Sequence, residues 1–311
     1  MGWFSRLLGG QDRAAAADSK KPGAAPAAPA PGSTAGAESS AASMPAAALG
    51  PPLLFWLLGA DDAQAPPAPQ AVERQAISVA DQLLAQASLP RELLPRAANV
   101  VPQLLALLRQ QDLPVPVLAE RIGRDPVLAA EVLRQAGGAF FAHLGPVADL
   151  PQAIQRLGTE GLQMAIARVV LRPMFQAAPD SLSARTATRL WEHADGLSQH
   201  AAQAARQAGL PAFDGYLVGL LHDTGWTVLF HALQRAGIVG LEPVSVAGAD
   251  ALAERAHRLF GLAAAPWEIT PGFAAFAADA QKRTLALSSH PLAAVLRAAE
   301  GPCMTELQGG G

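Results

Sequence analysis

The chain has 311 residues, of which 50% are apolar but only 5% aromatic, and its formal net charge is −3. An apolar core made mainly of alanine, leucine and valine favours closely packed helices over sheets. The slightly acidic balance excludes the basic surface typical of nucleic-acid-binding proteins, and the single cysteine, Cys303, excludes an internal disulfide. We therefore expect a cytoplasmic protein that has no nucleic-acid partner.

Residues 1–70 are predicted to be disordered. Between residues 14 and 52 the sequence is mostly alanine, proline, glycine and serine, which bury too little surface to offset the entropy of ordering the chain. Two apolar segments, residues 3–9 and 53–59, interrupt this region, and both end in Leu-Leu-Gly. Either they dock against the folded domain, or they are recognition segments on a tether, for a protein or a membrane surface.

Membrane association has weak support from these segments. Arg6 is their only basic residue, so neither segment has the positive face that anionic lipids attract. No apolar run approaches the roughly 20 residues that span a bilayer.

The folded domain is predicted over residues 71–300, with a flexible tail at residues 301–311 that contains Cys303. Apolar residues recur at helical spacing, and no stretch alternates as a strand does, so the predicted fold class is all-α. Asp125 followed by Pro126 indicates a helix start, and Gly137-Gly138 indicates its end. Further helices are expected at residues 71–87, 104–110, 117–123, 150–157, 161–172, 184–208, 213–224, 226–236, 249–259 and 285–299.

The adjacent pair His222-Asp223, which follows a small apolar run and precedes Gly225, is the strongest candidate for chemistry. Neutral imidazole and carboxylate both bind divalent cations such as Fe, Mn or Zn. His193 lies in the preceding long helix, and a short connection predicts that the two helices pack antiparallel. His193, His222 and Asp223 would then meet, either as metal ligands or as a buried hydrogen-bonded group without a cation.

The remaining candidates are scattered through the sequence. His231, His257, His290 and Glu300 are each interpreted as surface or packing residues. The sequence contains no Gly-rich phosphate loop, no serine-centred elbow and no Cys-x-x-Cys pair, so it predicts no organic cofactor and no nucleophilic catalytic residue.

Five motifs in order resemble the HDOD family, the signalling branch of the HD-domain superfamily. They lie at residues 89–95, 125–128, 153–158, 191–193 and 219–225, and the resemblance is best over residues 89–233. It implies an N-terminal helical bundle joined to an HD-like helical bundle, in a bacterial signalling protein. The wider superfamily uses a His, a His-Asp pair and a later Asp to bind a metal that hydrolyses phosphoesters. By that motif His193 matches the first ligand, His222 and Asp223 match the pair, and Glu300 is the nearest match to the last.

The sequence also departs from the family pattern. Gly137-Gly138 stands where the family often has Asn-Ser, and the His-rich region after the pair is reduced to the surroundings of His257. The Gly-Tyr-Pro signature of the cyclic-dinucleotide phosphodiesterases is absent. Our leading hypothesis is therefore a non-catalytic signalling or scaffold protein that binds a protein partner. The alternative is a metal-dependent phosphohydrolase acting on a nucleotide or phosphodiester, and a third possibility is a membrane-proximal adaptor. The sequence does not predict an oligomeric state.

Overall fold

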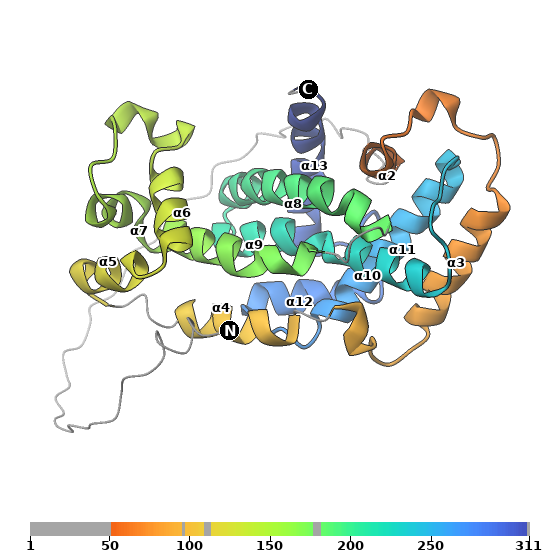
Figure 1. The fold of residues 1–311 in the computed structure, drawn as a ribbon, viewed down its shortest axis with the longest axis horizontal. Coiled ribbons are helices and arrows are strands. Elements are labelled where there is room, and N and C mark those ends of the chain that lie inside the picture. Colours follow the sequence, from red (N-terminus) through yellow and green to blue (C-terminus); the bar gives the residue numbers. More distant parts are fainter. Residues whose placement is uncertain (1–50, 95–96, 109–112, 177–181, 310–311) are drawn as a thin grey trace, which may run out of the picture. The chain divides into compact units, whose positions relative to one another are not determined.

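The computed structural model describes residues 51–94, 97–108, 113–176 and 182–309, and no strand occurs among them, which confirms the all-α fold class (Figure 1). None of the described helices has the length and apolar character needed to cross a membrane. The helices are α2 (Pro51–Leu58), α3 (Ala71–Leu84), α4 (Ala97–Leu108), α5 (Val115–Gly123), α6 (Pro126–Ala136), α7 (Leu150–Leu171), α8 (Leu182–Gln207), α9 (Ala212–His222), α10 (Thr224–Arg235), α11 (Val246–Ala264), α12 (Pro271–Ala280) and α13 (Pro291–Gly309).

Helices α4 to α7 pack together, and their ends follow local sequence rules. Asp125 caps α6, because its Oδ1 accepts hydrogen bonds from the backbone N–H groups of Val127 and Leu128 at 2.8 and 3.2 Å. The two helices expected at residues 150–157 and 161–172 form the single span α7, which kinks at Gly158. Gly158 has φ +61°, a conformation that favours glycine.

Helices α8 and α9 lie antiparallel at very short range, as the short connection between them predicts. A Cβ atom on Gly215 would lie 2.5 Å from the Ala201 carbonyl oxygen, and one on Gly219 would lie 2.7 Å from that of Leu197. Residues further along α9 therefore contact residues earlier in α8, at intervals of four residues. The next step in this register brings Asp223, at the end of α9, to His193.

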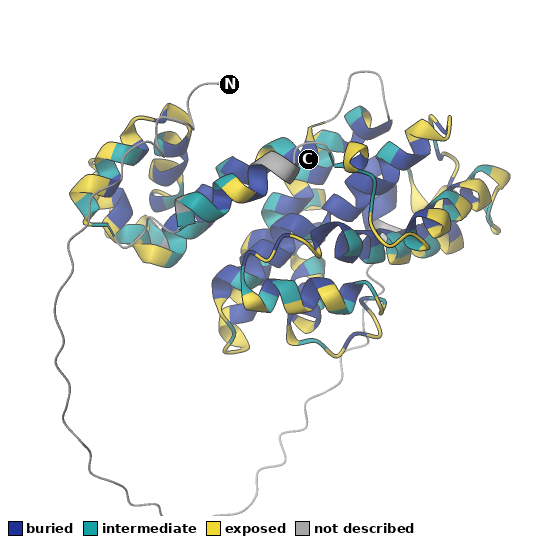
Figure 2. Ribbon diagram, turned by 90° about the horizontal axis from the view of Figure 1, so that it is seen from below, coloured by how far each residue is buried: buried dark blue, intermediate teal, exposed yellow. Residues whose placement is uncertain are grey.

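The core lies mainly on the inner faces of α8 to α13, and the exposed residues lie on their outer turns (Figure 2). Its largest fully buried side chains are aromatic: Tyr216, Phe230, Phe260, Phe273 and Phe276.

The structure corrects the expected limits of the folded domain at both ends. Residues 51–58 lie within the region predicted to be disordered, yet they form α2, which packs on α8 and α11. Docking is thus the correct alternative for the apolar segment 53–59, because this helix buries Leu53, Leu54 and Leu57. Residues 3–9 lie outside the described residues. At the other end α13 continues to Gly309 and buries Cys303 and Met304, so residues 301–309 are not a tail. Helix α12 was not predicted.

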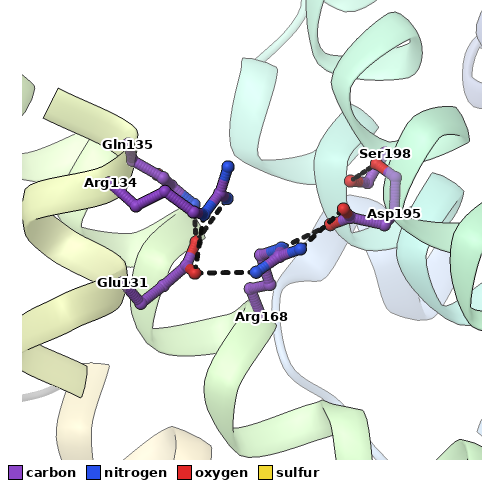
Figure 3. A network of polar contacts seen from close by, with 6 residues as sticks. All are labelled: Glu131, Arg134, Gln135, Arg168, Asp195 and Ser198. Atoms are coloured by element: carbon purple, nitrogen blue, oxygen red, sulfur yellow. Dashed lines mark hydrogen bonds and ion pairs between the residues drawn. The ribbon is translucent and has the colours of Figure 1, made fainter. Parts of the chain in front are cut away.

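Arg168 of α7 joins α6 to α8 through a charged network (Figure 3). Its Nη2 donates to Asp195 Oδ2 and its Nη1 donates to Glu131 Oε2, both at 2.7 Å. Arg134 and Gln135 also donate to Glu131. The Arg168 side chain is only 17% exposed, so these charges are partly withdrawn from water and tie the three helices firmly together.

Candidate functional site

The centre of the site is a buried contact between His193 of α8 and Asp223, which lies between α9 and α10. His193 Nδ1 and Asp223 Oδ2 are 2.6 Å apart, and both side chains are completely buried. Close packing of α9 on α8 sets this distance. The antiparallel helices predicted from the sequence thus bring these two residues together.

The pair is an imidazolium and a carboxylate. Burial alone would lower the pKa of His193, but the carboxylates of Asp223 and Glu300 outweigh it and hold that pKa well above the usual 6.5. Burial alone would raise the pKa of Asp223, but its contact with His193 lowers it to about 2. Each charge therefore stabilises the other in a place where either alone would be costly.

Glu300 of α13 lies on the other side of the His193 ring. Its Oε1 is 3.3 Å from His193 Nε2, an ion pair that lacks hydrogen-bond geometry, since this nitrogen has no hydrogen-bond partner. Glu300 was the nearest match in the sequence to the later Asp of the superfamily motif. It is thus in contact with His193. His193 is flanked by a carboxylate at each ring nitrogen.

His222 is adjacent to Asp223 in sequence, but it faces a different neighbour. Its Nδ1 lies 3.8 Å from Asp223 Oδ1, and its Nε2 lies 2.9 Å from Nδ1 of His257 in α11. His257 is buried, and desolvation and then the nearby His222 hold its pKa well below 6.5, so its ring is neutral.

Sequence reasoning missed the contact between His257 and His222. His257 is 35 residues from His222 in sequence, and only the packing of α11 brings the two together. Of the other scattered candidates, His231 donates a hydrogen bond from Nδ1 to the Leu93 backbone oxygen at 2.8 Å, so it joins α10 to the segment before α4.

A cavity of about 360 Å³ opens beside the His222 and His257 rings. It combines apolar walls with acidic groups, and its lining includes Leu53, His222, Trp226, Glu254, His257 and Glu300. Leu53 belongs to α2, so the N-terminal helix supplies part of the wall.

These side chains, as placed, do not fit a resident divalent metal. A cation needs several deprotonated donor atoms that point to one centre. Here His193 Nδ1 and Asp223 Oδ2 are bonded to each other, and His222 Nε2 faces His257. Within the described ranges no three His, Cys, Asp or Glu residues form a group that could hold a metal ion. Ligation by His193, His222, Asp223 and Glu300 therefore stays a prediction.

Comparison with known proteins agrees with this architecture. An uncharacterized protein of Treponema pallidum (strain Nichols) is 26% identical over 159 residues, which are 50% of this chain but only 28% of that protein. A solved structure from Shewanella amazonensis SB2B, provisionally described as a metal-dependent phosphohydrolase, aligns with TM-score 0.52 and 18% identity over 74% of this chain and 82% of its own.

An HDOD domain protein of unknown function from Geobacter sulfurreducens aligns with TM-score 0.40 and 20% identity over 76% of this chain and 94% of its own. The sequence model of the HDOD domain matches residues 94–266, more than half of the chain and all of the segment that carries His193, His222 and Asp223. The chain therefore belongs to the HDOD domain family.

Proposed function

We propose that this HDOD protein is a non-catalytic signal-transduction or scaffold protein of the bacterial cytoplasm, which acts by binding a signalling protein partner. The observation that carries the proposal is the buried bond between His193 and Asp223. The donor atoms that a hydrolytic cation would need are directed at each other, and Asp223 has no exposed surface. The pair serves to hold helices together.

The helical bundle before the HD-like part offers exposed apolar side chains for a partner. Val127 of α6 is 65% exposed and Leu144 is 54% exposed, and Val117 and Leu133 add to the apolar surface of the same bundle. Exposed apolar side chains of this kind are candidate contacts for a protein partner. Charged contacts through Arg168 connect this bundle to α8.

The alternative function is a metal-dependent phosphohydrolase, and the cavity beside His222 is the observation that favours it. A volume of about 360 Å³ is suited to a small ligand, and Glu254, His257 and Glu300 line it. This function requires the Asp223 carboxylate to turn away from His193. The buried His193 imidazolium would then lose the counter-charge that lies beside it.

Metal content and hydrolysis of the full chain, purified without chelator, decide between these functions. We expect less than one equivalent of Fe, Mn or Zn and no turnover of nucleotides, phosphomonoesters or phosphodiesters. His222→Gln is the informative variant, and His200→Gln is its control, because His200 pairs with Glu306 near the surface and does not line the cavity. A stoichiometric metal with turnover that His222→Gln abolishes and His200→Gln preserves would overturn the proposal.

A partner-binding experiment tests the positive half of the proposal. If the protein is a scaffold, Val127→Asp should lower the amount of partner that is recovered after cross-linking, whereas His222→Gln should leave that amount unchanged. If His222→Gln lowers the amount and Val127→Asp does not, the partner binds at the cavity instead.

A further inference from the structure

The cavity beside His222 is walled by several helices, and part of it lies outside the segment that matches the HDOD domain. Leu53 belongs to α2, residues 284–287 lie before α13, and Glu300 belongs to α13. At about 360 Å³ the cavity is in the size range of small-molecule sites. Because these walls lie outside residues 94–266, the ligand has to be inferred from the side chains of this chain.

One face of α11 makes the cavity acidic. Asp250, Ala253, Glu254 and His257 line it, and their spacing of three and four residues places them on one side of the helix. Asp250 and Glu254 are exposed, and neither makes a hydrogen bond or ion pair with another described residue. Two unpaired carboxylates therefore lie one helical turn apart at the cavity.

Glu300 of α13 adds a third carboxylate. Its Oε1 lies 3.3 Å from His193 Nε2, but His193 is already paired with Asp223, so two carboxylates share one imidazolium. None of the described residues that line the cavity is a lysine or an arginine. The lining therefore carries excess negative charge, which repels an anion such as a phosphoester and attracts a cation.

A buried imidazole at the cavity also lacks a partner. His257 is buried, and its Nδ1 lies 2.9 Å from His222 Nε2, but its own Nε2 has no hydrogen-bond partner among the described residues. When His222 is neutral with its Nδ1–H toward the Asp223 carboxylate, its Nε2 accepts from His257 Nδ1. Nε2 of His257 is then an acceptor, and an N–H donor from a ligand would give it the partner that it lacks.

The other walls of the cavity are apolar. Leu53, Leu197, Trp226 and Leu296 line it and are buried, whereas Leu287 lines it and is 77% exposed. A leucine side chain thus remains uncovered where the cavity meets the solvent. The aliphatic body of a ligand would cover this side chain and fill the space between the buried ones, which is favourable because it removes apolar surface from water.

We propose that this cavity binds a small organic cation with an aliphatic body, such as an alkylammonium ion. The ammonium group lies at the carboxylates of Asp250, Glu254 and Glu300, and the alkyl chain lies against the leucines. Such a ligand contacts α2, α11 and α13 together, so its binding supplies a signal that the helices can transmit. The inference goes beyond the proposed function and does not depend on it, since binding is measured without a partner or a metal.

Isothermal titration of the full chain with hexylammonium tests the proposal. The probe 1-hexanol has the same alkyl chain without the charge, and hexanoate reverses the charge. Hexylammonium should bind at least about fivefold more tightly than either. Propylammonium should bind more weakly, by about two- to fourfold for each methylene removed. Equal binding of hexylammonium and 1-hexanol, or binding of inorganic phosphate without binding of hexylammonium, would overturn the proposal.

Two variants locate the ammonium group. Asp250→Asn and Glu254→Gln each remove one charge and keep the side-chain size, so each should weaken hexylammonium binding about two- to fivefold. Glu192→Gln is the matched control, because Glu192 is an exposed carboxylate of α8 that does not line the cavity. If the control weakens binding as much as the two variants do, the cation is attracted by the acidic surface in general and the cavity is not its site.

A third variant locates the alkyl chain. Leu287→Ser removes an exposed apolar side chain from the cavity and should weaken hexylammonium binding about threefold, whereas Leu144→Ser, at an exposed leucine elsewhere, should not. Hexylammonium binding that is the same in both variants overturns the placement of the chain in the cavity.

Metal content and turnover of the same preparation separate this inference from the proposed function. If hexylammonium does not bind to a protein that has neither metal nor turnover, the inference fails alone. If a bound metal and turnover are found, the proposed function fails, and the titration still decides the inference.

Discussion

In an Asp223→Asn variant, the His193 imidazolium loses the carboxylate that lies 2.6 Å from it, while both side chains remain completely buried. Removing one member of a buried ion pair typically costs about 3–5 kcal/mol of unfolding free energy. Glu300 still lies 3.3 Å from the imidazole, so we expect a loss near the lower end, about 3 kcal/mol. A domain of this size should then melt roughly 6–12 °C lower.

The pH dependence of this loss follows from the two pKa values. The pKa of Asp223 falls from 3.8 to about 2 on folding, so its contribution is complete above about pH 4 and is lost as the pH falls through 2. That difference corresponds to about 2 kcal/mol. The pKa of His193 is raised well above 6.5, so its contribution is complete below pH 6.5 and is lost as the pH rises through the folded value.

The assay is guanidinium denaturation of wild type and variant from about pH 2 to about pH 9. The stability difference should be greatest between about pH 4 and 6.5 and should shrink on both sides. Asp250→Asn is the matched control, because Asp250 is an exposed carboxylate of α11 at the rim of the same cavity. If Asp223→Asn costs no more than the control, or costs the same at every pH, the pair is not the buried charge pair described above.

Three further changes test other contacts by thermal denaturation. Gly225→Ala puts a Cβ atom 1.9 Å from the Ala256 carbonyl oxygen and should cost about 1–3 kcal/mol, whereas Gly301→Ala meets nothing within 4 Å and should not lower Tm. Arg168→Lys keeps the charge but loses the two-point contact with Asp195, so we expect a loss of about 1–2 kcal/mol that salt does not restore. Leu54→Ala should cost about 2–5 kcal/mol and should make the backbone amides of α2 exchange their hydrogens faster. An unchanged Tm would mean that α2 does not pack against α8 and α11.

The parts of the fold that depend on local chemistry could be predicted from the sequence. Asp125 caps α6 as expected, because a cap involves only residues two and three positions further on. The approach of His193 to Asp223 was also predictable, since a short connection between two helices restricts them to antiparallel packing.

The parts that depend on distant contacts could not be predicted in this way. The eight residues of α2 have no helical signal beyond their apolar character. Their packing against α8 and α11 orders them as a helix. Pro302 suggests a helix end, yet α13 continues through it. Burial of Cys303 and Met304 offsets a cost of about 3 kcal/mol for a proline inside a helix.

A double replacement separates the structural role of the charge pair from a chemical one. His193→Phe alone leaves the Asp223 carboxylate buried without its counter-charge, and we expect a loss of about 3–5 kcal/mol. His193→Phe/Asp223→Leu removes both charges and keeps similar volumes, so it should recover at least half of that loss in a double-mutant cycle. If the losses simply add, the two residues act separately. A hydrolase would lose its activity in the double variant, whereas a scaffold whose helices are merely held together by the pair keeps both its fold and its partner.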